Sequence, residues 1–443
     1  MRHLRRSLIV WLMRDSTVDS DAEHGDRPDG LPVPGLFVLL ESGQPAAIPL
    51  PLPPQGLELG RGVPAGRFED DDQVSRAHAK IALEPKGVRV TDLGSRNGTF
   101  VDGARLSAPV LREPPFLLRI GRSLLWAVPD VRPFALAERG RRRDEDPVLG
   151  GLMSRAFGEI ALAAKAGDTL LITGESGAGK ELAARAFHAA GRSNDAPFVA
   201  VNCAAIPEGL AERLLFGAKR GAYSGAVDAD GYVQQAHGGT LFLDEIAELD
   251  AQVQAKLLRV LESRQVVALG GTKPQTVEIR ICAASHKRLR DQVAAGSFRA
   301  DLYYRIGRPE VAIAPLRERI DEIPWLAQRA LRQVSHELVA SAGLIERCAL
   351  LPWPGNVREL LRELRSAAVA ADAQGSTVVQ AEHLSADAGI ALAIESTAEP
   401  VRERDIDDAA IERALSEHDG NVTAAARALG MHRNQLRRRL DKR

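Results

Sequence analysis

The chain opens on a polar stretch and then continues as a series of short apolar segments. Residues 16–34 are rich in Asp, Gly and Pro, so we expect residues 1–34 to form a flexible extension. From residue 35 to about residue 129, Pro and Gly separate short apolar runs: Leu36–Leu40, Ala79–Leu83, Val88–Thr91 and Leu117–Ile120. Short strands at such regular spacing predict a β-sandwich or barrel in residues 35–130.

The pattern changes after a charged run at residues 138–146, which lies in an expected linker over residues 131–147. Between residues 148 and 324, buried-type strands alternate with helical stretches. The expected strands are Thr169–Ile172, Phe198–Val201, Thr240–Leu243 and Glu278–Ala283. This alternation predicts an α/β domain with a parallel sheet.

The rest of the chain has helical periodicity. Residues 325–394 are expected to be helical throughout, residues 395–404 form a second linker, and residues 405–443 are helical and end strongly basic. The predicted fold class is therefore multidomain. It consists of an all-β sandwich, an α/β domain with a helical subdomain, and an all-α C-terminal domain.

Composition narrows the class of protein further. A length of 443 residues suits about three domains, and 45% apolar with 26% charged residues is globular composition. A net charge of −1 excludes a polycation that coats nucleic acid or membrane, so any such patch must be local.

Cysteine usage and hydropathy both indicate the cytoplasm. The three cysteines form no CxxC pair and fit a reducing compartment. No apolar run approaches the roughly eighteen residues of a membrane helix, so no membrane partner is expected. The basic and apolar start of the chain mimics a short signal peptide, but Arg14 and Asp15 interrupt it and no small-residue cleavage site follows.

A glycine-rich loop connects the strand at Thr169–Thr173 to a helix-forming stretch at Glu181–His188. Its spacing matches the phosphate-binding pattern G-x-x-x-x-G-K in the required strand–loop–helix context. Backbone N–H groups and the positive end of the helix would surround a phosphate, and the lysine would reach the β- and γ-phosphate oxygens. We therefore expect ATP as a cofactor. The loop reads Gly174, Glu175, Ser176, Gly177, Ala178, Gly179, Lys180, and Glu181 takes the position where a hydroxyl usually binds Mg²⁺.

The strand at Thr240–Leu243 ends in two carboxylates, Asp244 and Glu245. A strand end of this kind is where phosphate chemistry takes place in α/β folds. We expect Asp244 to hold Mg²⁺, directly or through water, and Glu245 to orient and activate the attacking water. A solvated Asp-Glu pair without a function is the alternative.

Six motifs follow one another along the α/β domain and its helical subdomain. They are GESGAGKEL at 174–182, FVAVNCAAI at 198–206, GGTLFLDEI at 238–246, FRADLYYRI at 298–306, PLRERI at 315–320 and WPGNVRELL at 353–361. Together they resemble the AAA+ domain of bacterial enhancer-binding proteins, the sigma-54-dependent activators, over residues 148–390. The resemblance implies a homo-oligomeric ring, usually a hexamer, with ATP between protomers. Members of the family carry Glu after the P-loop lysine, as this chain does with Glu181.

The resemblance also implies roles for three arginines. Arg299 and Arg305 match the fingers that reach a neighbouring protomer's γ-phosphate. Such a finger contributes roughly 10³–10⁵ in rate in other phosphoryl-transfer proteins. Arg358 matches the sensor arginine that contacts the nucleotide from the helical subdomain.

Three further positions match residues near the hydrolytic centre of the family. Asn202 matches the residue that switches Glu245 between resting and active positions, and Ser285 and His286 occupy the first sensor site. The family commonly has Thr followed by Asn or His there, so Ser285 is a departure.

One glycine-rich loop falls where the family carries its GAFTGA loop, which grips sigma-54 and moves with ATP hydrolysis. Here Tyr replaces Phe and Ser replaces Thr, which keeps the ring and the hydroxyl but removes a methyl group. These two replacements concern the binding of sigma-54 RNA polymerase holoenzyme and do not affect the expected ATPase activity. A glycine-rich loop without a partner is the alternative. The residues are Gly221, Ala222, Tyr223, Ser224, Gly225 and Ala226.

Three groups of residues lie at strand ends or loops of the predicted sandwich: Leu59 to Arg61, Val74 to His78, and Asp92 to Thr99. Together they resemble a forkhead-associated (FHA) domain, a phosphothreonine reader. Arginines, a hydroxyl and an amide in loops suit a phosphate that carries nearly two negative charges. The resemblance implies a phosphothreonine protein as partner, in a pathway with a Ser/Thr kinase, and His78 is expected to brace the loops. A sandwich with incidental loop arginines is the alternative. The expected phosphothreonine-binding residues are Arg61, Ser75, Arg76, Arg96 and Asn97.

The last forty residues show the pattern of a helix–turn–helix. A short Ala-rich helix at Thr423–Leu429 precedes a basic helix at His432–Lys442, which suits the major groove of DNA. This segment resembles the Fis-type module, and a solvated basic helix is the alternative. The expected DNA-binding residues, at an upstream activating sequence, are His432, Arg433, Asn434, Gln435, Arg437, Arg438 and Arg439.

The sequence therefore predicts an ATP-hydrolysing activator that binds upstream DNA, remodels sigma-54 RNA polymerase to the open complex, and is controlled by an FHA phosphothreonine sensor. One alternative is a DNA-binding regulator that uses ATP as an assembly switch without remodelling. Another is a phosphopeptide scaffold whose ATPase is vestigial. The carboxylates Asp244 and Glu245 and the two finger arginines favour the motor.

Overall fold

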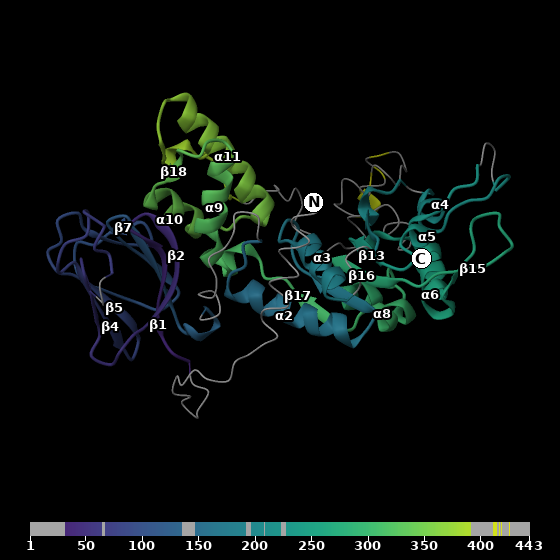
Figure 1. Cartoon of the computed structure of the whole chain (residues 1–443), viewed down its shortest axis with the longest axis horizontal. Coiled ribbons are helices and arrows are strands. Elements are labelled where there is room, and N and C mark those ends of the chain that lie inside the picture. Colours follow the sequence, from purple (N-terminus) through teal and green to yellow (C-terminus); the bar gives the residue numbers. More distant parts are fainter. Residues whose placement is uncertain are drawn as a thin grey trace. The chain divides into compact units, whose positions relative to one another are not determined.

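The computed structural model describes residues 32–63, 67–134, 147–191, 196–207, 209–222 and 227–390, with residues 411–413, 416, 418 and 425 (Figure 1). The chain divides into two compact units, residues 1–390 and 391–443. The elements below belong to the first unit. The expected N-terminal extension up to residue 31, the linker core at 135–146 and the second linker at 395–404 lie outside the described residues.

Residues 35–128 form a β-sandwich of two antiparallel sheets, which confirms the all-β prediction. One sheet has the order β2-β1-β10-β9-β6-β7 and the other β3-β4-β5-β8. Apolar side chains from both sheets, among them Leu36, Ile81 and Leu118, fill the space between them. The strands are β1 Gly35–Glu41, β2 Gln44–Pro51, β3 Leu57–Leu59, β4 Ala79–Glu84, β5 Gly87–Asp92, β6 Thr99–Val101, β7 Ala104–Arg105, β8 Val110–Arg112, β9 Phe116–Ile120 and β10 Ser123–Val128.

The next domain is built on a parallel five-stranded sheet with the order β12-β13-β16-β11-β17. All four predicted strands are present, although the last begins at Arg280 and not at Glu278. The strands are β11 Thr169–Thr173, β12 Phe198–Asn202, β13 Thr240–Asp244, β16 Arg280–Ser285 and β17 Glu310–Ala312, with a separate hairpin of β14 Gln265–Val266 and β15 Gln275–Thr276.

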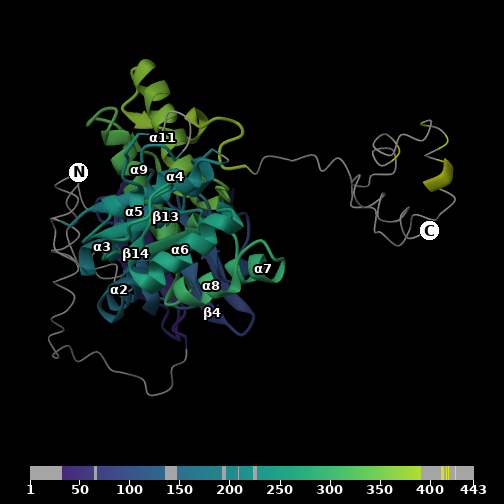
Figure 2. The same cartoon turned by 90° about the vertical axis from the view of Figure 1, so that its right-hand side faces the viewer.

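Helices cover both faces of this sheet. On one face, α2 and α3 contribute Ile160 and Phe187 to a core that contains Leu170 of β11. On the other face, α6 packs against α8 (Figure 2). The helices are α2 Gly151–Ala166, α3 Lys180–Gly191, α4 Ala211–Phe216, α5 Tyr232–Gln235, α6 Ala251–Ser263, α7 Leu289–Ala294 and α8 Ala300–Ile306, with short 3₁₀ turns η2 Cys203–Ala205 and η3 Ile246–Glu248.

The helical subdomain, called the lid below, follows from residue 323 and contains α9, α10 and α11. The prediction that this segment is helical throughout was wrong in one respect, because β18 and β19 form a short parallel pair. Two-residue strands are too short to show an alternating pattern in the sequence. The elements are η4 Leu316–Glu318, η5 Ile320–Glu322, α9 Ile323–Arg332, β18 Val339–Ala340, α10 Ala342–Leu350, α11 Asn356–Ala373, β19 Val378–Val379 and η6 Ala381–His383.

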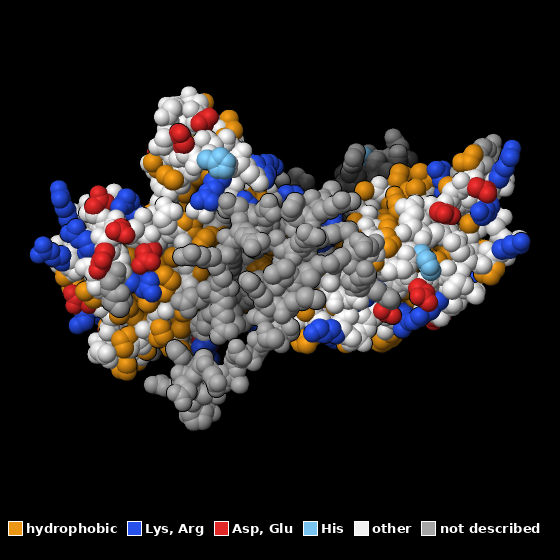
Figure 3. Space-filling model, in the orientation of Figure 1, with side chains coloured by type: hydrophobic (Ala, Val, Ile, Leu, Met, Phe, Trp, Pro, Cys, Tyr) orange, Lys and Arg blue, Asp and Glu red, His pale blue; other side chains and the backbone are white. Residues whose placement is uncertain are grey.

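The described surface agrees with the near-neutral composition. Basic and acidic side chains are interspersed over the face shown in Figure 3. Within the described residues, no helix combines the length and the apolar character needed to cross a membrane.

Candidate functional site

The glycine-rich loop connects β11 to α3, so its backbone turns at the carboxyl edge of the sheet. Gly177 adopts φ +74°, and a Cβ there would lie 2.3 Å from the carbonyl oxygen of Gly355 in the lid. Only glycine permits both this conformation and this approach. The loop backbone therefore touches the lid directly at Gly177.

Lys180 is the first residue of α3, and its side chain is only 7% exposed. Its Nζ donates to the carbonyl oxygens of Gly174 and Glu175 at 3.0 and 3.4 Å and to Oε1 of Glu245 at 3.1 Å. An ammonium group has three protons to donate, and here it faces three acceptors. The lysine is thus held at the centre of the loop, where a phosphate group would sit.

Asp244 ends β13, and its strand partner across the sheet is Asn202 of β12. Burial raises the pKa of Asp244 above its ordinary value, although the charge of Lys180 opposes this shift. Asn202 does not hydrogen-bond Glu245 in this structure; its Oδ1 accepts the N–H of Ala204 at 3.0 Å. The predicted switch residue and Glu245 are therefore on adjacent strand ends without a hydrogen bond between them.

Glu245 takes a left-handed backbone conformation, with φ 53°, just beyond the end of β13. Its Oε2 accepts hydrogen bonds from the backbone N–H of His286 at 3.1 Å and from Nδ1 of the same residue at 2.6 Å. Burial alone would raise the pKa of Glu245, but the hydrogen bonds from His286 and Lys180 outweigh it, so this pKa lies below its ordinary value. Glu245 is therefore a fixed carboxylate between the P-loop and the end of β16.

Two other predicted residues make local contacts. The Ser285 hydroxyl is buried and donates to the carbonyl oxygen of Lys287 at 2.8 Å, so it shapes the turn that places His286. Glu181 pairs with Arg185 one helical turn later, with 2.6 Å between the charged atoms. Neither residue hydrogen-bonds Asp244 or Glu245.

The P-loop is bound by residues of the lid and of the segment that leads into it, and sequence reasoning gave no role to Arg317 or Asn356. Arg317 forms a two-pronged ion pair with Glu175, at 2.8 and 3.0 Å, and this pair is the main reason that the pKa of Glu175 is lowered. The buried Asn356 donates from Nδ2 to Glu175 Oε2 at 3.0 Å. The predicted sensor, Arg358, reaches Ser176 Oγ at 3.4 Å. The PLRERI and WPGNVRELL motifs were the sequence signal for these contacts.

Arg299 directly precedes α8 and Arg305 lies on it, and both are exposed. Arg299 pairs with Asp301 at 2.7 Å, and Arg305 donates to the carbonyl oxygen of Leu261 at 3.3 Å. Among the described residues, neither arginine forms a hydrogen bond or ion pair with the P-loop of its own chain.

The predicted sigma-54 loop is described only at its base. Gly221 and Ala222 are described, whereas residues 223–226, and with them Tyr223 and Ser224, lie outside the described residues. An antiparallel bridge pairs Ala218 with Ala229 across the base. The two ends of the loop are therefore held side by side.

The predicted phosphothreonine residues come together at loops of the sandwich. The N–H of Arg96 donates to Ser75 Oγ at 3.1 Å, and Asn97 Nδ2 donates to the carbonyl oxygen of Gln73 at 2.8 Å, so two loops distant in sequence are joined. His78 is buried and contacts both loops, through Ser75 N at 3.0 Å and Gly98 O at 3.2 Å, which confirms its bracing role. The side chains of Arg61, Arg76 and Arg96 are exposed.

The predicted DNA-binding residues, His432 to Arg439, lie outside the described residues. Comparison with known families covers this part of the chain. Residues 404–442 match the model of bacterial regulatory proteins of the Fis family. Three further models match: the FHA domain at residues 58–122, the sigma-54 interaction domain at 150–312 and the AAA+ ATPase lid domain at 317–399.

Similar proteins are bacterial regulators. The chain is 39% identical over 325 residues to the response regulator protein PilR of Pseudomonas aeruginosa, covering 70% of this chain and 73% of PilR. It is 36% identical to the transcriptional regulator NtrC of Azospirillum brasilense, covering 70% and 72% of the two chains. A crystal structure of NtrX from Brucella abortus aligns with a TM-score of 0.50 at 31% identity, covering 66% of this chain and 67% of NtrX.

The P-loop, the parallel sheet and the lid define an AAA+ ATPase, which binds nucleotide. The chain belongs to the sigma-54-dependent transcriptional activators, with a Fis-type DNA-binding domain at its C-terminal end and an FHA domain before the ATPase.

Proposed function

We propose that this activator hydrolyses ATP to remodel sigma-54 RNA polymerase into the open complex, and that its FHA domain senses phosphothreonine on a partner protein. The contact between Lys180 and Glu245 carries the proposal, because it joins the phosphate-binding lysine to a fixed carboxylate at the end of β13. The reaction is ATP + H₂O → ADP + phosphate. The hydrolysis would drive a movement of the activator against sigma-54 RNA polymerase.

The contacts of Lys180 suggest how hydrolysis begins. Phosphate oxygens are stronger acceptors for an ammonium group than backbone carbonyls, so bound ATP would draw Nζ away from Gly174, Glu175 and Glu245. Glu245 would keep its bonds to His286 and gain a free oxygen, Oε1, for the attacking water. A glutamate whose pKa is at or below its ordinary value is ionised at neutral pH, as a general base requires.

The residues present fit a magnesium ion bound with ATP. Asp244 Oδ1 accepts the N–H of Glu245 at 3.1 Å, and Oδ2 makes no hydrogen bond with the described residues. A carboxylate oxygen and phosphate oxygens are the ligands that Mg²⁺ prefers. When bound, the ion would neutralise charge on the phosphates; Asp244 would hold it, and the P-loop would hold the phosphates themselves.

The arginines support a ring, for which we propose the hexamer. Arg299 and Arg305 are exposed and have no bond to their own P-loop among the described residues, so they suit the γ-phosphate of a neighbouring protomer. Arg358 already contacts Ser176 within its own chain, so we assign it to the nucleotide in cis.

The remaining partners follow from the other domains. The loop at residues 221–226 is assigned to sigma-54, since its base is pinned by the Ala218–Ala229 bridge while its tip carries Tyr223 and Ser224. The exposed arginines of the FHA loops suit a phosphothreonine protein in a Ser/Thr kinase pathway. The Fis-type tail would place the ATPase on DNA upstream of the promoter, with Arg433 to Arg439 on phosphates and bases.

The test measures ATP turnover and open-complex formation in the same reactions, with sigma-54 holoenzyme and a promoter that carries the binding site. Wild type should do both, Glu245→Gln neither, and Ser224→Ala should turn over ATP without opening DNA. ATP turnover by wild type without open complexes would contradict remodelling and favour the assembly-switch alternative.

A further inference from the structure

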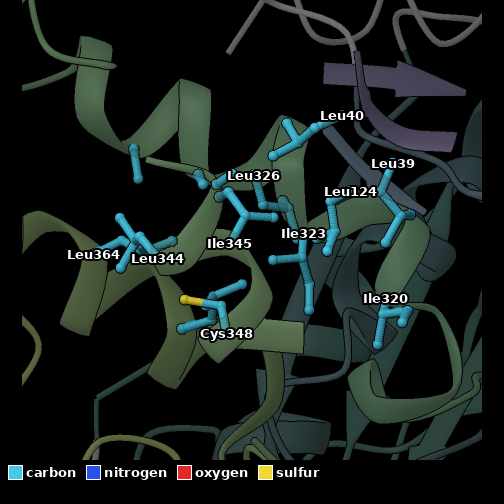
Figure 4. Packing of buried hydrophobic residues seen from close by; sticks show 14 of the residues in the cluster. Leu39, Leu40, Leu124, Ile320, Ile323, Leu326, Leu344, Ile345, Cys348 and Leu364 are labelled. Carbon is cyan, nitrogen blue, oxygen red and sulfur yellow. The ribbon is translucent and has the colours of Figure 1, made fainter. Parts of the chain in front are cut away.

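The FHA sandwich and the lid share one hydrophobic core. Side chains on the outer face of the β1–β10 sheet, including Phe37, Leu39 and Leu124, lie in the same buried cluster as lid residues Ile323 and Ile345. Figure 4 shows Leu39, Leu40 and Leu124 directed toward Ile320, Ile323, Leu326 and Ile345. Helix α9 packs against β2, and α10 packs against β9 and β10.

The sequence of the strands carries the same signal. An antiparallel sheet usually has one face in water, so its strands alternate between apolar and polar residues. In β1 and β10 nearly every residue is buried, with Leu36 and Val38 facing the sandwich core while Phe37 and Leu39 face the lid. The outer face of this sheet is therefore built to be covered, and the lid of the same chain covers it.

An ion pair fixes the register of this contact. Arg119 of β9 donates from Nε to Oε2 of Glu346 of α10 at 2.6 Å, and the N–H of Gly103 donates to Oε1 of the same carboxylate at 3.1 Å. The Glu346 side chain is 5% exposed and that of Arg119 19%. Both carboxylate oxygens accept hydrogen bonds from the FHA domain, so separating the two domains would break both bonds.

The lid in turn holds the nucleotide site. Arg319, at the entrance to the lid, is 2% exposed and bonds both the P-loop carbonyl oxygen of Ala178 and Glu322 of η5. Asn356, the first residue of α11, bonds Glu175 and Ser176 of the P-loop. Packed side chains and hydrogen bonds thus run without interruption from the FHA sheet through the lid to the P-loop.

The phosphothreonine loops remain accessible while this face is covered. The side chains of Arg61, Arg76 and Arg96 are exposed, and none of them belongs to the shared core. Binding of a phosphoprotein and docking on the lid are therefore compatible.

The geometry points to the outer face of the β1–β10 sheet as the surface that couples phosphoprotein binding to the ATP site, with the lid of the same chain as its partner. The FHA domain and the lid move as one body, so an occupant of the phosphothreonine loops changes the position of the lid and with it the affinity for nucleotide. The role of the occupant rests on the proposed phosphothreonine function; the coupling of the sheet face to the ATP site does not.

The test uses full-length protein and a fluorescent ADP analogue. In Arg119→Glu, two carboxylates would face each other at the interface. Hydrogen exchange at β10 and α10 should then rise, and the affinity for the analogue should fall about fivefold or more. The charge swap Arg119→Glu with Glu346→Arg should restore both to near wild-type values. Arg112→Glu, at the exposed end of strand β8 in the other sheet, is the matched control and should change neither.

A second variant guards against a mere loss of folding. Leu39→Asp places a carboxylate in the shared core, and unchanged exchange in β4 and β5 would show that the sandwich is intact. Opening of the interface in both variants without a change in affinity for the analogue would overturn the coupling. Unchanged hydrogen exchange at β10 and α10 in both Arg119→Glu and Leu39→Asp would overturn the interface itself.

A separate arm adds a degenerate phosphothreonine peptide mixture, with its unphosphorylated form as control. Binding of the phosphopeptides should shift the affinity of wild type for the analogue and leave that of Arg119→Glu unshifted. Absence of phosphopeptide binding would contradict the sensor function alone, because the interface variants test the coupling without any peptide. Binding with equal shifts in wild type and Arg119→Glu would overturn the route through the interface.

Discussion

Nδ1 of His286 lies 2.6 Å from Oε2 of Glu245, and the backbone N–H of His286 bonds the same oxygen at 3.1 Å. One residue at the end of β16 thus fixes the carboxylate that follows β13. The opposite carboxylate oxygen faces Lys180. Because a general base works only when it points at its water, we expect His286 to be a positioning residue for hydrolysis.

Replacing His286 by Ala should lower the kcat for ATP about tenfold to hundredfold and change KM less than about twofold, since the P-loop contacts stay intact. His286→Asn keeps a side-chain donor and should recover most of the activity. Steady-state ATPase assays check both variants. A rise in KM with an unchanged kcat would instead assign His286 to nucleotide binding.

Asp92 should stabilise the FHA loops at neutral pH. Burial alone would raise its pKa, but hydrogen bonds from Ser95, Thr99 and Gly94 lower it to about 2. A depressed pKa stabilises the folded state above the ordinary pKa of Asp, and this stabilisation is lost as pH falls from about 4 toward 2.

Asp92→Asn should therefore unfold more easily than wild type at pH 7 by about 1 kcal/mol, after discount for solvent screening of a partly exposed group. The difference should shrink as pH falls through that window. Urea unfolding of the two proteins across pH measures it, with the exposed Asp70→Asn as the control. A difference that stays constant down to the lowest pH would show that the charge of Asp92 is not its source.

The finger arginines should act between protomers. Arg305→Ala should bind ATP normally and lose turnover by at least about 10³-fold. Lys180→Ala should be inactive as well. Mixing the two should restore part of the activity, because some interfaces then join an intact P-loop to an intact Arg305. Mixtures as inactive as the separate variants would place Arg305 in its own chain's site.

A buried arginine should stabilise the ATPase domain without entering its chemistry. Arg280 is 1% exposed, donates hydrogen bonds to the carbonyl oxygens of Phe187, Ala164 and Gly167, and pairs with Asp168 at 3.7 Å. Arg280→Met removes these buried hydrogen bonds and should lower the free energy of unfolding by about 3 kcal/mol. Arg155→Met, which breaks an exposed pair with Glu159, should cost less than about 0.5 kcal/mol. Denaturant titrations measure both free energies of unfolding. Equal losses in Arg280→Met and Arg155→Met would contradict the stabilising role of Arg280.

Much of the fold and the nucleotide site could be predicted because their signals are local. The strand before Gly174 and the helix after Lys180 follow from hydrophobic period and glycine spacing within a dozen or so residues. The end of β13 was found the same way, since three apolar residues, Leu241 to Leu243, directly precede Asp244. Such signals need no knowledge of how distant segments pack.

The contacts between elements could not be predicted, because they depend on strand order and on packing between distant segments. The His286–Glu245 bond requires β13 and β16 to be neighbours, and the Arg119–Glu346 pair joins residues 227 positions apart. The contact between the FHA sheet and the lid did have a signal in the sequence. The unbroken apolar run at Leu36–Leu40 is unusual for an antiparallel strand and pointed to a covered outer face.

The most direct test of the central claim is promoter melting by purified full-length protein with sigma-54 holoenzyme, read by permanganate reactivity of unpaired thymines. The account predicts melting with ATP, none with a non-hydrolysable ATP analogue, and none with Glu245→Gln in the presence of ATP. Melting by Glu245→Gln, or by wild type with the analogue, would show that ATP acts as a binding switch and would contradict hydrolysis-driven remodelling.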